Sequence, residues 1–521
     1  MRPAYLAQTI RAAEEPLLES LPGVLMQRAA AGLASAVLRE LRARAGVYGA
    51  RVLLVVGAGN NGGDALYAGA RLLDRGVRVR AWRTSSDVHE GAVRAFLGAG
   101  GREVDAVGAV AELGRTDLVI DGVLGIGGRP GLPQPVALFA RACADARVPM
   151  VSVDLPSGLS ADSPNRGVGL VETRGVELVE TKDNATGDVV STSSTDRGVE
   201  HVETRGVELV ETRGVELVET THFTADLTVT FGGLKFCHVL EPSASACGRI
   251  ELVDIGLDLP APDLRVWQQV DVAAVWPWPD AKSDKYSRGV VGIDTGSARY
   301  PGAAVLSTLG AVHAGAGMVR FTGAAEASDL VRAAAPNVVA GAGRVQAMVL
   351  GSGWGDHSDG AATVDRALHT GLPLVLDADA LRCLPDRPLG EQVLLTPHAG
   401  ELARLLETSR EQVQGDPIAA VRSVAQRFHC SVLLKGATQY ACTPDGQVTI
   451  AVAGPAWTAQ AGSGDVLAGV CGTLLAAGLA PDSAALAAAS VQALAAAARP
   501  GPLPPQDIAR SLVGVVRSLR L

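Results

Sequence analysis

The first half of the chain alternates short apolar runs with amphipathic segments rich in Ala and Leu. A helical pattern covers residues 11–44, and later runs rich in β-branched residues each close in a loop that carries Gly or Asp. These runs are residues 51–56, 77–82, 117–125 and 148–158. Short apolar runs separated by helices are typical of parallel strands in a doubly wound sheet, whose polar loops gather at one edge. We therefore expect a Rossmann-like α/β domain here.

The second half repeats this alternation. Strand-like runs lead into polar loops in GVVGIDTG, MVRFTG, AMVLGSGWG, LPLVLDADAL, VLLTPHAGE and CSVLLKGA, and a small-residue loop then opens a long Ala-rich helix. A second parallel α/β domain is expected. Because 521 residues exceed what one hydrophobic core usually serves, and a stretch with Pro and Trp spans 257–280, we predict domains at 1–265 and 281–521, joined by a linker at 266–280.

An octapeptide repeat interrupts the first domain. Between Arg166 and Thr220 the unit RGVELVET recurs in five near-identical copies, divided by a polar stretch. A unit this short and this charged builds no core of its own, and the polar stretch has the composition of a linker. We predict a surface insertion at 166–221, with a short β-solenoid or a stack of hairpins as the structured alternative.

Charge and composition narrow the function classes. The formal net charge is −9, whereas a protein that neutralises nucleic-acid phosphates needs a surplus of Lys and Arg, so no nucleic-acid partner is expected. Seven scattered Cys without a CxxC pair favour reduced thiols over a disulfide framework or a zinc site. No targeting region or membrane-spanning run is evident, so we expect a cytoplasmic protein without a membrane partner. We also expect a homo-oligomer.

The loop GAGNNGGD, residues 57–64, stands where a predicted strand leads into a helix. Its glycines leave backbone N–H groups free, and a pyrophosphate would suit that position. The spacing is not GxGxxG, so a tight turn with packing glycines is the alternative. Asn60, Asn61 and Asp64 favour a ligand, because two amides and a carboxylate on short side chains are more than a turn requires.

Two further strand ends carry Asp. Asp121 is followed by a glycine-rich loop, and Asp154 lies in VDLPSG with Ser157 close by. A lone Asp at such a position is most often a cap or a turn former. Three polar strand ends that converge on one crevice favour a functional site.

In their order and spacing, NNGGD, the Asp121 loop and VDLPSG resemble the NAD(P)HX epimerase domain. The resemblance implies that Asp154 is a catalytic acid/base, which exchanges a proton with the hydrated nicotinamide ring near neutral pH. It implies a K⁺ ion held by Asn61, Asp121 and Ser157. It also implies that NAD(P)HX, the hydrated cofactor, binds to Asn60, Asn61, Gly62, Gly63 and Asp64, and to Gly125, Ile126, Gly127, Gly128, Arg129, Pro130 and Gly131.

In the second half, AGSGDVLAGV places Asp465 in the first turn of a predicted helix. Free N–H groups there would stabilise charge on a transferring phosphoryl group, while the Asp takes a proton from the attacking hydroxyl. As a bare string, GSGD is also a common capped helix start. Lys435 at a strand end and the loop with His398 and Glu401 favour the functional interpretation, although a His in a loop is more often polar surface.

Seven segments of this half resemble the ribokinase-like fold, and within it the NAD(P)HX dehydratase family. They are residues 285–304, 314–320, 350–355, 376–381, 396–401, 434–439 and 461–469. The resemblance implies phosphorylation of the ring hydroxyl followed by loss of phosphate, with Asp465 as the base and His398 as a second catalytic residue. It implies ADP, with ATP as the alternative donor, together with Mg²⁺. The implied cofactor-binding residues are Ala303, Gly353, Lys435, Gly436, Ala437, Thr438, Gln439 and Gly464.

Both halves depart from the family pattern. The repeat insertion follows closely on Asp154, and the loop before GSGD has Ala453 and Trp457 where the family often carries Asn and a smaller apolar residue. The combined expectation is a bifunctional enzyme that epimerises R and S NAD(P)HX and dehydrates the S form. The alternative is a ribokinase-like small-molecule kinase with an N-terminal nucleotide-binding module.

Overall fold

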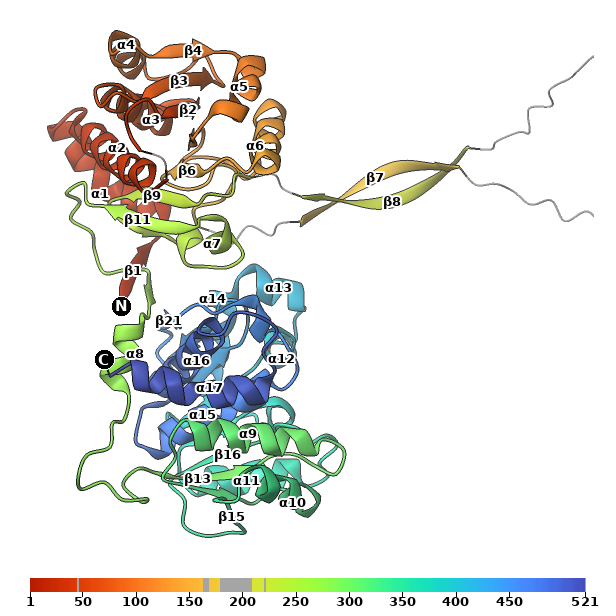
Figure 1. Ribbon diagram of the computed structural model, residues 1–521. Helices are drawn as coiled ribbons and strands as arrows, with labels where there is room; N and C mark the ends of the chain where they lie inside the picture. Colours follow the sequence, from red (N-terminus) through yellow and green to blue (C-terminus); the bar gives the residue numbers. More distant parts are fainter. Residues whose placement is uncertain (45, 163–167, 179–208, 220–221, 521) are drawn as a thin grey trace, which may run out of the picture.

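The first half of the chain forms a seven-stranded sheet that is parallel throughout. The computed structural model describes residues 1–44, 46–162, 168–178, 209–219 and 222–520 (Figure 1). The strand order is β11-β9-β6-β5-β2-β3-β4. The strands are β2 (Arg51–Val56), β3 (Arg78–Arg83), β4 (Arg102–Val104), β5 (Leu118–Gly122), β6 (Met150–Val153), β9 (Leu227–Phe231) and β11 (Arg249–Val253). The order reverses between β2 and β5, where open α/β sheets bind their ligands.

Helices cover both faces of this sheet because its strands are apolar on both sides. Val52, Leu54 and Val56 pack with one group of helices, and Leu53 and Val55 pack with the other. The first group is α2 (Val24–Arg44), α3 (Gly59–Leu73) and α4 (Glu90–Gly98), and the second is α5 (Ala106–Glu112) and α6 (Gln134–Ala146). α1 (Ala7–Ser20) precedes them.

The second half supplies most of a twelve-stranded sheet, whose order is β10-β1-β12-β21-β20-β19-β18-β17-β16-β13-β14-β15. Its parallel core is β13 (Val290–Asp294), β14 (Met318–Phe321), β15 (Val339–Ala340), β16 (Ala347–Leu350), β17 (Leu374–Leu376), β18 (Val393–Leu395) and β19 (Ser431–Leu434). Two antiparallel strands follow, β20 (Tyr440–Cys442) and β21 (Val448–Ile450).

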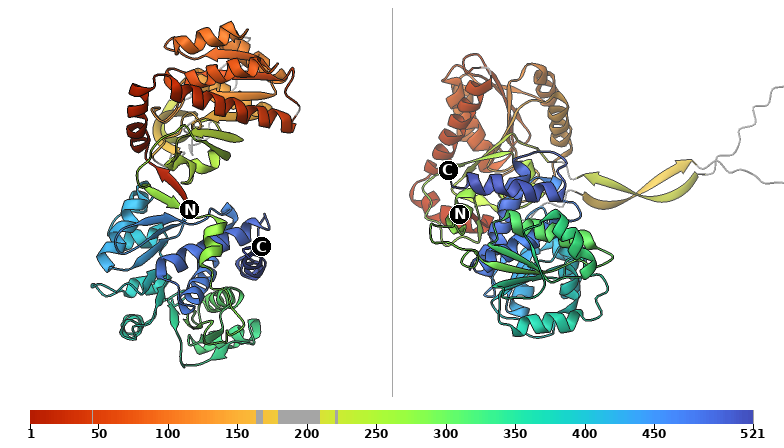
Figure 2. Two further views of the ribbon diagram at one scale, coloured as in Figure 1. Left: turned by 90° about the vertical axis from the view of Figure 1, so that its left-hand side faces the viewer. Right: turned by 60° about the horizontal axis from the view of Figure 1, so that its bottom comes forward.

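Helices flank this second sheet too (Figures 1 and 2). They are α9 (Pro301–His313), α10 (Ala325–Ala334), α11 (Gly360–His369), α12 (Ala399–Leu405), α13 (Arg410–Gly415), α14 (Pro417–Phe428), α15 (Ser463–Ala476), α16 (Pro481–Ala497) and α17 (Pro505–Ser518). The nearly all-apolar α15 and α16 are buried along most of their length. This half therefore has a core of its own.

Three short strands from the first half of the chain extend the second sheet. β1 (Arg2–Tyr5) lies between β10 (Leu234–Lys235) and β12 (Leu264–Val266), and β12 pairs with β21. In Figure 1, β1 lies between the two halves. The stretch expected as a linker contains α8 (Gln269–Val275), whose Val272 is buried in the second core. The two halves are thus joined by the pairing of β1, β10 and β12 into the second sheet as well as by the chain itself.

The octapeptide repeats contribute a two-stranded antiparallel ribbon, β7 (Val168–Leu178) with β8 (Leu209–Glu219). The ribbon extends away from both sheets (Figure 1). The copy at 197–204 and parts of the other four lie outside the described residues, so the choice between surface insertion and stacked repeats stays open there.

The predicted α/β fold class, with two mainly parallel sheets, is confirmed. The apolar run 225–235 is divided into β9 and β10, which belong to different sheets. Gly232 makes the division, because its φ of +71° turns the chain out of the first sheet. Within the described part of the chain, no single helix has the length and hydropathy of a membrane span. Among the described helices, only α1 and α2 reach that length and hydropathy when taken together, and they are bent by 115° relative to each other.

Candidate active sites

The first crevice lies where the loops after β2 and β5 meet. Glycine permits this approach: a Cβ at Gly57 would lie 2.0 Å from the carbonyl oxygen of Val123, and one at Gly62 would lie 2.1 Å from that of Gly57. α3 begins at Gly59, so the predicted loop residues form the first turn of a helix, where free N–H groups attract anions. Among these residues Asn60 is exposed, whereas Asn61, Gly62, Gly63 and Asp64 are buried.

The three predicted cation ligands lie close to one another. Ser157 donates to Asp121 through its Oγ, at 2.6 Å from Oδ1, and through its backbone N–H, at 2.8 Å from Oδ2. Asn61 Nδ2 donates to the carbonyl oxygen of Val153 at 3.0 Å, and its Oδ1 faces Gly125. Burial raises the pKa of Asp121 to about 6, against hydrogen bonds from Ser157 and Ser152.

Asp154 is held in an unusual backbone conformation and a buried ion pair. Its φ of +69° is left-handed, which costs a non-glycine residue about 1–2 kcal/mol. Lys235 Nζ lies 2.5 Å from Asp154 Oδ1, and Thr230 Oγ1 donates to the same oxygen at 3.0 Å. Burial alone would raise the pKa of Asp154, but the charge and hydrogen bond of Lys235 outweigh it, so this pKa lies below its usual value. Asp154 is therefore ionised at neutral pH, the state in which it can accept a proton.

Asp64 has the opposite character. It is 8% exposed, and its Oδ1 is buried without a hydrogen-bond partner among the described residues. Burial raises the pKa of Asp64 well above its usual value, and the charges of Asp154 and Glu14 add to the effect. Glu14, on α1, also has a raised pKa because of burial. One ionised carboxylate and acids with raised pKa values therefore share this crevice.

Several residues of this crevice were not predicted from the sequence. Lys235 on β10 and Thr230 on β9 donate hydrogen bonds to Asp154, and Glu14 on α1 interacts with it electrostatically. The one available signal was Lys235, a charge at the end of an apolar run, because a buried Lys requires a partner. Nothing in the local sequence around Glu14 distinguishes it from a surface helix residue.

Cys237, His238 and Cys247 form a buried cluster whose ligand atoms lie within 4.8 Å of one another. Both ring nitrogens of His238 are engaged: Nδ1 accepts from the backbone N–H of Lys235 at 3.0 Å, and Nε2 lies 2.9 Å from the carbonyl oxygen of Asp154. The imidazole therefore has no free nitrogen for a metal. Its contacts connect it to Asp154 instead.

The second predicted cofactor loop, residues 125–131, lies beside the Ser157 turn, because Gly131 N–H donates to Gly158 O at 2.9 Å. Arg11 Nη2 donates to Ile126 O at 2.8 Å. Gly127, Arg129 and Pro130 are exposed, and the other members, Gly125, Ile126, Gly128 and Gly131, are partly buried. A hollow of about 420 Å³, lined in part by Met26, Tyr67 and His89, lies beside Gly63 on the same helix as Asn61.

The second site is built around the start of α15. Asp465 lies in the first turn of this helix, as predicted, and Gly462 precedes it with a φ of +89°. A Cβ at Gly464 would lie 3.3 Å from Lys435 Nζ, so the helix start meets the end of β19. The predicted nucleotide-binding residues Lys435 and Gly464 are thus neighbours.

Lys435 connects Asp465 to a third polar residue that the sequence analysis did not single out. Lys435 Nζ lies 2.6 Å from Asp377 Oδ1, and Asp377 also accepts from Ser352 and Thr396. Burial, with the charge of Asp377, raises the pKa of Asp465 to about 6, against the effect of Lys435. Burial would lower the pKa of Lys435, but the charge of Asp377 raises it above its usual value. Asp465 can therefore accept a proton near neutral pH.

His398 begins α12 as its N-cap. Its Nδ1 accepts from the N–H groups of Gly400 and Glu401, and Glu401 Oε2 accepts from the backbone N–H of His398 at 2.8 Å. Burial lowers the pKa of His398, against the charge of Glu401. The backbones of His398 and Lys435 form an isolated parallel β-bridge. This β-bridge brings the neutral imidazole to the edge of the second sheet near Asp465. A proton-transfer role for His398 stays a prediction.

The remaining predicted contacts divide into two groups. Ala303 and Gly353 are adjacent, because a Cβ at Gly353 would lie 2.5 Å from that of Ala303. In the loop Lys435, Gly436, Ala437, Thr438 and Gln439, the Gln439 Oε1 is buried without a partner among the described residues. Thr438 Oγ1 accepts from the backbone N–H of Glu241 at 2.8 Å, so this loop touches the first half of the chain.

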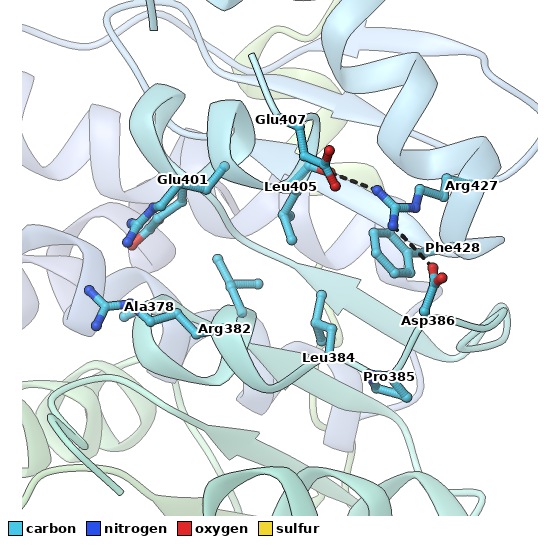
Figure 3. Close-up of a pocket in the computed structure, with 12 residues that line it drawn as sticks. Ala378, Arg382, Leu384, Pro385, Asp386, Glu401, Leu405, Glu407, Arg427 and Phe428 are labelled. Atoms are coloured by element: carbon cyan, nitrogen blue, oxygen red, sulfur yellow. Dashed lines mark hydrogen bonds and ion pairs between the residues drawn. The ribbon is translucent and has the colours of Figure 1, made fainter. Parts of the chain in front are cut away.

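A hollow of about 250 Å³ lies beside the second site, between η3 (Ala378–Cys383) and α12 (Figure 3). It includes Ala378, which follows Asp377, and Glu401, which caps α12. Arg427 closes its far end, with donors at 2.8 Å from Leu405 O and 3.0 Å from Asp386 Oδ1 (Figure 3). Its lining is evenly mixed in charge and gives no reason to assign it a ligand.

Two α/β units, one with the buried Asp154 and the other with the half-buried Asp465 beside glycine-rich loops, define a bifunctional α/β enzyme as the class of this protein. Residues 22–172 match the family model for the YjeF-related protein N-terminus, and residues 291–510 match that for NAD(P)H-hydrate dehydratase. The chain belongs to the family of bifunctional NAD(P)H-hydrate repair enzymes.

Two relatives support this membership. The bifunctional NAD(P)H-hydrate repair enzyme of Mycobacterium tuberculosis is 43% identical over 93% of this chain and 91% of its own length. That of Mycobacterium leprae is 44% identical over 100% of this chain and 99% of its own. A crystal structure of an ADP/ATP-dependent NAD(P)H-hydrate dehydratase from Bacillus subtilis, co-crystallised with ATP/Mg²⁺, covers 49% of this chain and 99% of its own, with 25% identity and a TM-score of 0.46.

Proposed function

We propose that this chain repairs hydrated nicotinamide cofactors in two steps, epimerisation of R and S NAD(P)HX in the first half and nucleotide-dependent dehydration of the S form in the second. The observation that carries the proposal is the pair of carboxylates, the buried Asp154 and the half-buried Asp465, each placed at the polar edge of its own sheet. One activity is that of an isomerase and the other that of a lyase. We take 1–265 and 281–521 as the respective domains.

In the epimerase centre, Asp154 is the base that takes a proton from the hydrated ring. Its ionised state at neutral pH suits proton removal. The helix start of α3 and the loop 125–131 would hold the anionic part of NAD(P)HX through backbone N–H groups. The pKa values of Asp64 and Glu14 are raised, so these carboxyl groups are protonated at a higher pH than free ones.

The residues Asn61, Asp121 and Ser157 fit a K⁺ ion. Asp121 is completely buried, no Lys or Arg among the described residues pairs with it, and the three side chains offer hard oxygen atoms. A bound K⁺ would supply positive charge that fixes the loops after β5 and β6. Asn61, Asp121 and Ser157 would hold it.

In the dehydratase centre, Asp465 takes the proton from the ring hydroxyl, and the first turn of α15 stabilises the charge on the transferred phosphoryl group. Lys435 and the loop through Gln439 would hold ADP, or ATP, and the unpartnered Gln439 Oε1 is free to accept from it. Ala303, Gly353 and His398 would contact NAD(P)HX. Loss of phosphate then restores the double bond, giving AMP and phosphate from ADP.

Mg²⁺ fits this centre only as an ion that accompanies the nucleotide. The nearby carboxylate of Asp377 already accepts from Lys435, Ser352 and Thr396, so the described residues leave it little capacity for a metal. Mg²⁺ usually binds through one or two carboxylates together with substrate phosphates. When bound, it would neutralise charge on the phosphates of the nucleotide. Asp465 would still accept the proton, and Lys435 would still contact the nucleotide.

Two variants test the proposal with separated R and S hydrates. Asp154→Asn should leave R unconverted while S still yields NAD(P)H, because only the first centre is lost. Asp465→Asn should stop the formation of NAD(P)H from both hydrates. R and S should still interconvert, as followed by separating them on a chiral column. An Asp154→Asn variant that repairs R as fast as the wild type contradicts the assignment, and a stable phosphoester product would indicate the kinase instead.

The expected cytoplasmic location and homo-oligomeric state complete the proposal. Neither is needed for the two centres, because each is built from one chain. Gel filtration with light scattering tests the second expectation directly, and a purely monomeric protein would contradict it.

A further inference from the structure

Lys235 is a buried cation at the epimerase centre that no catalytic step uses directly. It is 1% exposed, and its Nζ has an acceptor for each of its protons: Asp154 Oδ1 at 2.5 Å, Thr230 Oγ1 at 2.8 Å and Phe231 O at 3.1 Å. An ammonium has three donors and no acceptor. Lys235 therefore has no donor left for a substrate, and any effect on the reaction must pass through Asp154.

The hydrogen bonds to Asp154 are concentrated on one of its two carboxylate oxygens. Lys235 and Thr230 both donate to Oδ1, and none of the described residues donates to Oδ2. This arrangement orients the carboxylate while leaving Oδ2 for the proton of a substrate. A base must reach its proton within hydrogen-bonding distance, so this orientation is a requirement for catalysis.

The residues next to Lys235 hold the backbone of Asp154 as well. His238 Nδ1 accepts from the backbone N–H of Lys235, and Nε2 of the same ring contacts the carbonyl oxygen of Asp154 at 2.9 Å. Since Nδ1 accepts, Nε2 carries the proton and donates. The segment 235–238 thus fixes both the side chain and the left-handed main chain of Asp154.

The charged and titratable groups around Asp154 make a cation necessary. Asp64 on α3 and Glu14 on α1 both interact with it unfavourably when ionised, and His238 packs against its backbone. A buried carboxylate with acidic neighbours would ordinarily be protonated. Lys235 supplies the one compensating full positive charge within hydrogen-bonding distance among the described residues.

We propose that Lys235 is a positioning residue of the epimerase, which fixes Asp154 as an oriented, ionised base with Oδ2 free for the substrate. The inference rests on the proposed epimerase activity. Lys235 lies on β10, a strand of the second sheet, so the base of the first domain is held by an element paired into the sheet of the second.

The test uses the full-length chain and the pH profile of kcat/KM for epimerisation. Lys235→Met and Lys235→Gln remove the charge, so the acid limb of the profile should move up by about one to three pH units. Epimerisation at pH 7 should fall about 100-fold, the usual contribution of a general base. Lys235→Arg keeps the charge and should keep the limb at its wild-type position.

Two controls separate this role from a purely structural one. Dehydration of the pure S hydrate, measured on the same samples, reports whether the second half is intact, and Lys282→Met changes an exposed Lys without touching either site. A loss of epimerisation that is equal at every pH, or an unshifted acid limb in both neutral variants, overturns the proposal. A wild-type protein that does not epimerise at all instead refutes the proposed function.

Discussion

The two carboxylates that we assign as bases have opposite electrostatic surroundings. The ammonium of Lys235 outweighs burial at Asp154 and keeps its pKa low. At Asp465, burial and the charge of Asp377 prevail over Lys435, and the pKa rises to about 6. The difference follows from geometry, because Lys235 is hydrogen-bonded to Asp154, whereas Lys435 is hydrogen-bonded to Asp377 and only lies near Asp465.

This difference predicts different pH dependences for the two activities. A base must be ionised, and a raised pKa means that Asp465 becomes protonated as the pH falls through about 6. Dehydration of the S hydrate should therefore decline tenfold per pH unit below that value, whereas Asp154 should remain ionised there and epimerisation should persist. Initial rates between pH 5 and 8 check this. Dehydration that is constant down to pH 5 would contradict the role of Asp465.

At the residue scale, the sequence predicted the groups at strand ends but not their partners. Asp121 lies near the end of β5, Asp154 follows β6, and Asp465 lies in the first turn of α15, each within two residues of Gly, Pro or Ser. Lys235 is 81 positions from Asp154, and Asp377 is 58 positions from Lys435. Such pairs depend on strand order, which local patterns do not encode.

Among the elements, the contact between α9 and α15 positions the start of α15. Two glycines allow the helices to touch: a Cβ at Gly469 would lie 1.9 Å from Ser307 O, and one at Gly310 would lie 2.3 Å from Val466 O. These distances are well below van der Waals contact, and the obstructing atoms belong to backbone. Neither helix can turn a side chain aside to make room.

Gly469→Ala should therefore destabilise the chain by about 1–3 kcal/mol or more, as overpacking does in a close-packed core. Gly514→Ala is the matched control, because Gly514 lies in α17 with no atom within 4 Å of the added Cβ. Its change should be neutral, or stabilising by up to about 1 kcal/mol. Denaturant unfolding measures both, and equal effects of the two substitutions would show that the α9–α15 contact is not tight.

At this scale the apolar patterns predicted the strands well but not where each would pair. The runs at 51–56 and 117–125 became strands as expected, with β5 covering the apolar part of the second run, and both are central in the sheet. The run 225–235 was divided because of a positive φ at Gly232, and no hydrophobic pattern reveals a backbone dihedral. Strand pairing across the two halves is likewise a property of tertiary packing.

On the scale of the whole molecule, the two catalytic halves share structure through β1, β10 and β12, while the repeat ribbon extends away from both (Figures 1 and 2). The chain leaves and re-enters the first domain at neighbouring points. Phe223 N–H donates to Ser157 O at 3.1 Å, and Asp162 Oδ1 accepts from the backbone N–H of Ala7 at 2.6 Å. The residues that flank the insertion are therefore held by contacts within the first domain, which do not depend on the insertion itself.

Replacement of residues 163–221 by a short Gly/Ser linker should leave both activities within about twofold of the wild type. It should also leave the Tm nearly unchanged, because loop length has only a weak effect on closure entropy. Separate assays of epimerisation and dehydration, with a melting curve, check this. A selective loss of epimerisation would show that the insertion is part of the Asp154 crevice.

Whether one chain carries both repair activities is decided by the recovery of NADH from an equal mixture of R and S hydrates. The purified wild-type protein is incubated with the mixture, ADP, Mg²⁺ and K⁺ for a time in which uncatalysed epimerisation is negligible, and the absorbance of the reduced ring is followed. If both centres work as assigned, NADH is recovered from the entire mixture. Recovery that stops at the S half, or no recovery, would contradict this assignment.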